Sequence, residues 1–261
     1  MDLINKIRQL IASPGFTGFY FDDQAAIKGD AVEDGCTYHG NCLTKGFSAV
    51  RQAGESISIQ LVLEDGQVAY GDCAAVQYSG AGGRDPLFLS SQFIPIINDH
   101  ISNFLVGRSL DNFRGLAEEI DNYHYKGKRL HTALRYGLTQ ALLDAVARSK
   151  GLTRTEVVVD EYGLELHTEP IPIFCQTGDE RYLNVDKIII KKADVMPHGL
   201  INNVKTKLGK NGEKLLLYIA WLKNRIKEIG SDDYHPIFHI DVYGTIGEAF
   251  NSNMAMIDYF A

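Results

Sequence analysis

The segment HPIFHIDVYGTIG, residues 235–247, contains the side chain best suited to chemistry, the carboxylate of Asp241. Residues 236–242 combine apolar side chains with a turn signal at Gly244, and this pattern predicts a short buried strand. A carboxylate in an apolar strand is costly to bury without a partner. In parallel α/β folds, ligands and metals bind at the C-terminal ends of strands. Asp241 is therefore either a metal ligand or a cap for the turn that follows the strand.

A glycine-rich stretch, YSGAGGRDPLF at residues 78–88, is the second candidate. Its glycines suggest a phosphate-binding loop, but no Lys-Ser or Lys-Thr pair follows and the dinucleotide-binding spacing is absent. Loops beside active sites are commonly rich in glycine. We interpret the stretch as a mobile loop rather than as a nucleotide site.

The hydrophobic pattern at the start of the chain predicts only short elements and a loop. Residues 3–12 fit either an amphipathic helix or a strand, and Pro14-Gly15 would end that element. A short aromatic strand is expected at residues 18–23. Residues 28–45 show no hydrophobic period, which predicts a long loop.

A strand pair and three helices are expected next. Apolar residues alternate from Ile57 to Leu63, which predicts a half-buried strand, and the Asp65-Gly66 pair predicts a tight turn to a partner strand at residues 68–76. Apolar stripes then predict helices over residues 91–105, 110–123 and 130–149, the last stopped by Gly151. Strands followed by helices, without alternation, predict an α+β domain over residues 1–166.

The pattern changes at residue 167. Short apolar strands are expected at residues 171–176, 187–191 and 236–242. Helices are expected at residues 200–208, at residues 213–229 with Leu216, Ile219, Leu222 and Ile226 on the buried side, and from residue 253. Alternating strands and helices predict the opening of a parallel barrel or sheet.

The length of the chain limits how much of a barrel it can hold. A complete parallel barrel needs on the order of 200 residues or more, whereas residues 171–261 number only 91. The end of the chain, MAMIDYFA, is apolar and carries no helix stop signal. We therefore expect a longer natural protein of which this chain is the N-terminal part.

Composition narrows the class of protein. The formal charge of −7 argues against a general nucleic-acid binder. No apolar run approaches the roughly 20 residues of a membrane span, and the N-terminus, MDLINKIRQL, lacks the features of a signal peptide. Four cysteines in a chain of 261 residues suggest reduced thiols, so we expect a cytoplasmic location.

Several long motifs resemble a known family. They are QAGESISIQLVLEDG, GDCAAVQYSGAGGRDPLF, LHTALRYGLTQALLDA, GDERYLNVDKIIIK, MPHGLINNV and YHPIFHIDVYGTIG. The resemblance is to the 3-methylaspartate ammonia-lyases of the enolase superfamily, and it runs from about Phe19 to the end. It implies an enolase-like fold: an α+β N-terminal capping domain, residues 1–166, followed by an incomplete α/β (TIM-type) barrel, residues 167–261.

The resemblance also implies an activity. Enzymes of this family are carbon–nitrogen lyases that convert 3-methylaspartate to mesaconate and ammonia through an enolate stabilised by Mg²⁺, with an activating monovalent cation such as K⁺. The proton at C3 lies beside a carboxylate and is weakly acidic, so a divalent cation on that carboxylate lowers the cost of removing it. The full-length protein is expected to be a homodimer with a small-molecule amino-acid substrate and no nucleic-acid or membrane partner.

Three residues match the family's site. Asp241 matches the first of three carboxylates that hold the metal; the other two, and a lysine base, would follow Ala261, so residues 1–261 alone are expected to be inactive. His198 matches a histidine that contacts substrate and acts as an acid or base on one face of it. Gln176 matches a residue that contacts the substrate carboxylate. Without the resemblance, His198 would be interpreted as an exposed neighbour of a helix start and Gln176 as a solvated strand end.

Two functions from different classes remain open on the sequence. The first is a carbon–nitrogen lyase of which this chain is one part. The second is a non-catalytic remnant or binding module of the same fold. The lyase is favoured if the reading frame continues past Ala261 into a strand that ends in Glu, another that ends in Asp, and a later strand that carries Lys. A stop codon directly after Ala261 favours the remnant.

Overall fold

The computed structural model describes residues 5–29, 31–75, 85–177, 180–197, 199, 201, 203–250 and 253–260. The chain divides into two compact units, Met1–His167 and Thr168–Ala261. Most of the glycine-rich stretch and His198 lie outside the described residues. Among the described residues, no helix combines the length and apolar character that crossing a membrane requires.

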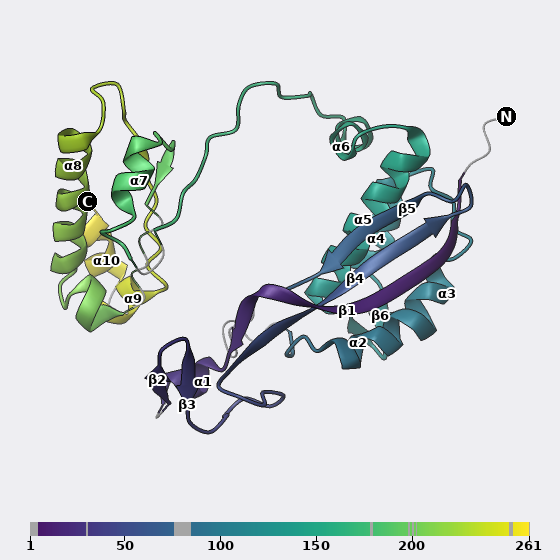
Figure 1. Cartoon of the computed structure of the whole chain (residues 1–261), viewed down its shortest axis with the longest axis horizontal. Helices are drawn as coiled ribbons and strands as arrows, with labels where there is room; N and C mark the ends of the chain where they lie inside the picture. Colours follow the sequence, from purple (N-terminus) through teal and green to yellow (C-terminus); the bar gives the residue numbers. More distant parts are fainter. Residues whose placement is uncertain are drawn as a thin grey trace. The chain divides into compact units, whose positions relative to one another are not determined.

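The first unit is built on a three-stranded antiparallel sheet in the order β1-β4-β5 (Figure 1). These strands are β1 (Ile7–Asp22), β4 (Arg51–Leu63) and β5 (Val68–Cys73). The alternation predicted for β4 is confirmed, because Ile57, Ile59, Leu61 and Leu63 are all fully buried. The tight turn is also confirmed: Gly66 has a φ of +88° and its N–H donates to the Leu63 carbonyl at 3.0 Å.

Strand β1 corrects the prediction that Pro14-Gly15 ends the first element. Pairing with β4 continues through this dipeptide, Pro14 opposite Ile57 and Gly15 opposite Ser56, and the irregularity falls later, between Phe16 and Tyr20. β1 is an edge strand, where a proline without an N–H can be placed without losing a ladder hydrogen bond. The separate strand expected at residues 18–23 is therefore the end of the same strand.

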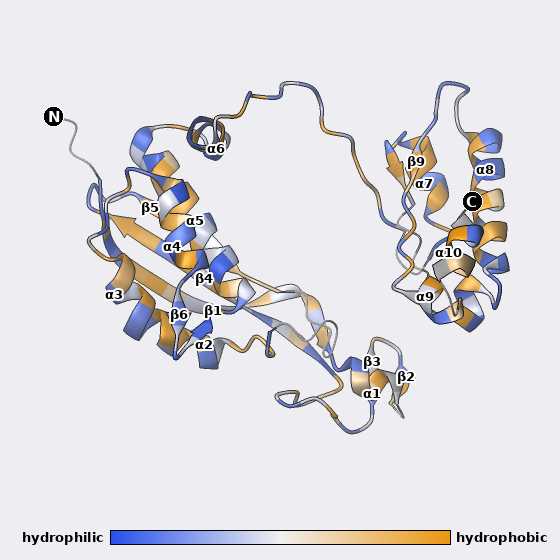
Figure 2. Ribbon diagram, turned by 180° about the vertical axis from the view of Figure 1, so that it is seen from behind, coloured by the Kyte–Doolittle hydropathy of each residue, from blue (hydrophilic) through white to orange (hydrophobic). Residues whose placement is uncertain are grey.

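Helices cover the buried face of this sheet (Figures 1 and 2). The predicted helix at residues 91–105 is confirmed as α2 (Ser90–Ile96), a π-helical turn η1 (Ile97–Ile101) and α3 (Ser102–Leu105). α4 (Phe113–Asp121) is shorter than predicted, α5 (Thr132–Lys150) agrees, and α6 (Arg154–Tyr162) follows. Gly151 ends α5 in the left-handed conformation, as predicted. One apolar core joins these helices to β4.

The predicted long loop at residues 28–45 is partly wrong. It contains a small hairpin of β2 (Val32–Asp34) and β3 (Thr37–His39), which follows the short helix α1 (Gln24–Lys28). The two-residue turn begins with Gly35, whose φ is +58°, as such hairpins require. The hairpin is mostly exposed, so hydrophobic periodicity could not reveal it. A second small hairpin, β6 (His124–Tyr125) and β7 (Lys128–Arg129), precedes α5.

Asp23 holds the segment around this hairpin in place. Its fully buried carboxylate accepts hydrogen bonds from the backbone N–H groups of Leu43 and Thr44 and from the Thr44 hydroxyl, each at 2.8 Å. It also caps α1 through the Ala26 N–H at 3.3 Å. Burial by itself raises the pKa of Asp23, but these hydrogen bonds outweigh it and lower the pKa to about 2.

We expect Asp23→Asn to lower the free energy of unfolding by about 2 kcal/mol at neutral pH, because a carboxylate with a depressed pKa stabilises the folded state. This contribution is present above the unfolded pKa of 3.8 and is lost as the pH falls towards about 2. Urea titrations between pH 7 and pH 3 would therefore show the wild-type advantage shrinking at the acid end. Asp34→Asn, at an exposed carboxylate paired with His39, is the control and should change little. Equal losses in the two variants would contradict the assignment.

The second unit contains four helices, one π-helical turn and a two-stranded parallel sheet among its described residues. The elements are α7 (Val185–Ile190), β8 (Val195–Met196), η2 (Val204–Leu208), α8 (Glu213–Ile229), β9 (Ile237–Phe238), α9 (Thr245–Ala249) and α10 (Asn253–Phe260). The helices predicted at 213–229 and from 253 are confirmed. The helix predicted at 200–208 reduces to η2 in the described residues.

The strand predicted at residues 187–191 is wrong, because residues 187–190 lie in helix α7 and Lys191 is its C-cap. Val185, Ile188 and Ile189 are buried, a helical spacing that begins before the KIIIK run, while Ile190 is 71% exposed. The β-branched residues favour a strand locally, but packing of one helical face overrides that preference.

The strands predicted at 171–176 and 236–242 are much shorter than expected. The first reduces to a single bridge at Phe174 and the second to β9 with a bridge at Asp241. Ile173 and Ile237 are more than half exposed, so neither segment is the fully buried strand that its apolar side chains predicted.

The buried face of helix α8 differs from the prediction at one residue, because Leu216 is 54% exposed and Leu215 and Tyr218 are buried instead. Leu222 is buried as predicted, and Ile219 and Ile226 pack against the core. Tyr218 is the largest fully buried side chain of this unit among the described residues.

Candidate functional site

Three extended segments of the second unit lie side by side and run in parallel. Val195 is at the centre, because its N–H donates to the Ile173 carbonyl at 3.1 Å and its carbonyl accepts from the Cys175 N–H at 3.0 Å. On the other side, β9 continues the ladder through the His239 N–H, which donates to the Met196 carbonyl at 3.0 Å. The C-terminal ends of all three segments therefore meet at one edge.

The residues predicted for the site follow these ends. Gln176 comes directly after Cys175 in the first segment and is exposed. Asp241 follows β9 in the third segment and is partly buried. His198 follows the central segment in the sequence but lies outside the described residues. The structure therefore brings Gln176 and Asp241 to the same edge of one parallel arrangement.

Asp241 has the contacts of a turn cap. Its Oδ1 accepts a hydrogen bond from the Tyr243 N–H at 3.1 Å, and its backbone carbonyl accepts from the Ile201 N–H at 2.8 Å. A carboxylate has about four acceptor positions, so accepting from the Tyr243 N–H does not by itself exclude a metal ion as a further partner. The capping role and a metal-binding role are therefore compatible, and a hard carboxylate oxygen is the kind of donor that Mg²⁺ prefers.

One residue that supports this edge, Thr245, is not among the site residues predicted from the sequence. Thr245 is buried, and the Ile201 and Val242 carbonyls share its single hydroxyl donor, at 2.9 and 2.7 Å from the oxygen. It ties the segment after His198 to the turn after Asp241. The available signal is its place in DVYGT, where a hydroxyl residue follows the glycine turn at the start of helix α9.

In the part of the chain that the structure describes, no group of three or more His, Cys, Asp or Glu side chains could hold a metal ion. Asp241 is therefore a single candidate ligand rather than a member of a described ligand set. The four cysteines are free thiols.

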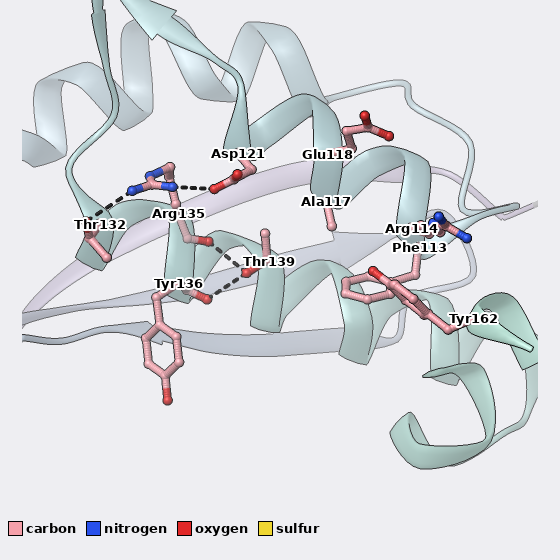
Figure 3. A pocket seen from close by; sticks show the side chains of 10 residues that line it. All are labelled: Phe113, Arg114, Ala117, Glu118, Asp121, Thr132, Arg135, Tyr136, Thr139 and Tyr162. Carbon is pink, nitrogen blue, oxygen red and sulfur yellow. Dashed lines mark hydrogen bonds and ion pairs between the residues drawn. The ribbon is translucent and has the colours of Figure 1, made fainter. Parts of the chain in front are cut away.

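A cavity of about 590 Å³ lies in the first unit and contains none of the predicted site residues. Figure 3 shows its lining, contributed by α4, α5 and Tyr162 of α6. Its two arginines already have partners: Arg135 binds Asp121 and the Thr132 hydroxyl, and Arg114 lies 5.0 Å from the Tyr162 ring centroid. Nothing in this lining resembles an activated acid, base or nucleophile.

Comparison with known families decides which family these features belong to. The profile described as "Methylaspartate ammonia-lyase N-terminus" matches residues 5–163, and that described as "Methylaspartate ammonia-lyase C-terminus" matches residues 165–261. The chain belongs to the methylaspartate ammonia-lyase family. The resemblance drawn from the sequence motifs is confirmed.

Curated methylaspartate ammonia-lyases are close relatives. The protein of Clostridium tetanomorphum is 60% identical over 256 residues, which cover 97% of this chain and 62% of that protein. The protein of Haloarcula marismortui is 45% identical over 261 residues, covering 98% of this chain and 62% of that protein. This chain therefore spans about 62% of the length of these relatives.

Solved structures agree with this assignment. The Mg complex of the Clostridium tetanomorphum beta-methylaspartase has a TM-score of 0.89 at 60% identity, covering 98% of this chain and 62% of that one. The Citrobacter amalonaticus methylaspartate ammonia lyase containing (2S,3S)-3-methylaspartic acid has a TM-score of 0.90 at 57% identity, covering 94% of this chain and 60% of that one. The muconate lactonizing enzyme of Pseudomonas putida, at 13% identity and a TM-score of 0.57, shares the fold alone. The chain therefore has a partial enolase-like fold.

Proposed function

We propose that the full-length protein containing this chain is a carbon–nitrogen lyase that converts 3-methylaspartate to mesaconate and ammonia. The observation that carries the proposal is the shared edge of the three parallel segments, where Gln176 and Asp241 both follow C-terminal ends in a chain of this family. That edge is where parallel α/β folds bind their ligands.

In the proposed fold, residues 1–166 form an α+β capping domain and residues 167–261 form the opening part of a TIM-type barrel. The parallel ladder of the second unit supports this, because a barrel of this type is built only from parallel strands. By the same resemblance we propose a cytoplasmic homodimer activated by a monovalent cation such as K⁺.

Asp241 is the proposed Mg²⁺ ligand. Bound Mg²⁺ would supply positive charge beside the substrate carboxylate, which lowers the cost of removing the neighbouring C3 proton. Asp241 suits this task because the Tyr243 N–H and the Ile201 N–H hold its side chain and backbone in place.

Gln176 is the proposed contact for a substrate carboxylate, since an amide N–H₂ donates two hydrogen bonds. Its exposure at the end of the first segment leaves it accessible to a small molecule. His198 is the proposed acid or base on one face of the substrate, because imidazole titrates near neutral pH.

The test is formation of mesaconate from 3-methylaspartate by the purified full-length protein, followed by absorbance with and without Mg²⁺. We expect turnover that depends on Mg²⁺ and is abolished by a chelator. The polypeptide of residues 1–261 is the comparison, and we expect it to form no mesaconate, since the family resemblance implies that two further metal ligands and the lysine base follow Ala261. A full-length protein that binds neither Mg²⁺ nor 3-methylaspartate would instead support the non-catalytic binding module.

His198→Ala in the full-length protein tests the proposed acid–base role. We expect Mg²⁺ affinity to stay within about twofold, whereas turnover or C3-proton exchange falls by about 10²-fold or more on the one epimer whose C3 proton faces the histidine. Parallel assays on the two C3 epimers, with deuterium exchange followed by NMR, provide the measurement. An equal loss on both epimers would contradict a face-specific role.

A further inference from the structure

We propose that Tyr218 of helix α8 is a positioning residue for the reaction, because it contacts both the segment after Gln176 and the segment after His198. The proposal rests on the proposed function, which assigns Gln176 and His198 to the substrate. Neither the sequence motifs nor the family comparison singles out Tyr218. It is identified by where its hydroxyl and its ring lie.

The hydroxyl of Tyr218 fixes the segment that follows Gln176. It donates a hydrogen bond to the Arg181 carbonyl at 3.0 Å and is hydrogen-bonded to the side chain of Thr177. Thr177 is itself buried, and its carbonyl accepts from Asn184 Nδ2 at 3.2 Å. Gln176 ends its extended segment, and the next residue, Thr177, is held in place by Tyr218.

The ring of Tyr218 supports the segment that follows His198. Gly199 is packed so closely that a Cβ atom there would lie 2.9 Å from Cε1 of Tyr218 and 3.5 Å from its hydroxyl oxygen. On the other side, the Ile201 N–H donates to the Asp241 carbonyl at 2.8 Å. Residues 199 and 201 are thus held between Tyr218 and the segment that carries Asp241.

The ring can serve as a fixed spacer because its surroundings hold it. Tyr218 is 1% exposed. Its ring centroid lies 5.3 Å from that of Tyr182 in an edge-on arrangement and 6.0 Å from that of Trp221 in a stacked one, and the Arg181 guanidinium lies 5.4 Å from it. Burial raises the pKa of Tyr218 to about 12, so the hydroxyl remains a donor across the working pH range.

One rigid side chain therefore sets the spacing between two strand ends. A misplacement of about 1 Å in a catalytic group can cost about 10²-fold in rate. Tyr218 contacts neither substrate nor metal in this proposal, and it acts only through the neighbours of Gln176 and His198.

Tyr218→Phe in the full-length protein tests the hydroxyl. The variant keeps the ring and loses the bond to the Arg181 carbonyl, so we expect KM for 3-methylaspartate to rise about tenfold while the rate ratio between the two C3 epimers stays unchanged. Tyr259→Phe is the matched control, because the hydroxyl of Tyr259 also donates to a backbone carbonyl of the same unit, that of Gly212 at 3.0 Å, which belongs to neither the segment after Gln176 nor the segment after His198. We expect Tm to fall by a similar amount in Tyr218→Phe and in the control, and KM to stay unchanged in the control.

Gly199→Ala tests the ring contact. The added Cβ would press against Tyr218, so we expect turnover of the epimer assigned to His198 to fall about tenfold or more relative to the other epimer. Gly247→Ala is the control, since the nearest atom to its Cβ would be Met256 Sδ at 4.0 Å.

The outcomes separate this inference from the proposed function. A wild-type protein without Mg²⁺-dependent mesaconate formation would overturn the proposed function and this inference with it. An active wild type in which Tyr218→Phe matches Tyr259→Phe, with lower Tm and normal KM, would overturn the inference alone. An unchanged epimer ratio in Gly199→Ala would do the same.

Discussion

Asp241→Asn in the full-length protein is expected to lower kcat for 3-methylaspartate by about 10²-fold or more and to weaken Mg²⁺ binding at the same time. Asparagine keeps the size of the side chain and an oxygen that can accept from the Tyr243 N–H. It removes the negative charge that a hard divalent cation requires. Raised Mg²⁺ should therefore restore part of the activity, which steady-state assays over a range of Mg²⁺ concentrations would show.

The control for this variant is Asp233→Asn, which removes an equal charge from an exposed ion pair with Lys192 in the same unit. We expect its Mg²⁺ affinity and kcat to match the wild type. Normal Mg²⁺ binding in Asp241→Asn, with only the pH–rate profile altered, would mean that Asp241 is an acid–base group or a turn cap and that the metal assignment is wrong.

Gly137→Ala is expected to lower the stability of the first unit substantially. Gly137 lies in α5 where the helix backbone approaches β5, and a Cβ there would lie 2.5 Å from both the backbone nitrogen and Sγ of Cys73. The helix or the strand would have to move, which typically costs about 3 kcal/mol in a close-packed core. This loss outweighs the gain of about 1 kcal/mol that alanine gives over glycine in a helix.

The measurement is urea unfolding of the full-length protein, with Gly18→Ala as the matched control. Gly18 is exposed in β1 and no atom lies within 4 Å of where its Cβ would be, so we expect a change of no more than about 0.5 kcal/mol. A Gly137→Ala protein as stable as the wild type would show that α5 can move away from the sheet at little cost.

The elements that were predicted correctly share one property. Each has a long hydrophobic period, and the residues that this period puts on one face are the ones buried in the structure. β4 alternates over Ile57 to Leu63 and buries each of these apolar residues, and α5 carries a stripe that ends at Gly151. In such segments the local pattern and the tertiary contacts favour the same conformation.

The elements that the sequence missed were short or were decided by contacts far along the chain. The KIIIK run is helical because Val185, outside the run, completes a helical face. β1 passes through Pro14 because this strand lies at a sheet edge. α8 buries Tyr218 rather than Leu216, since the partner surface selects the face.

The sequence by itself determined the family, and its expected elements and strand ends led to the proposal of two parts and of Asp241 as a metal ligand. Strand ends and long motifs are local properties that a sequence records directly. Only the tertiary structure decided that Gln176 and Asp241 follow the two outer of three parallel segments at one edge, and that Tyr218 contacts the segments that follow Gln176 and His198. Register between segments separated by 20 to 65 residues depends on backbone hydrogen bonds and packing, which no local pattern specifies.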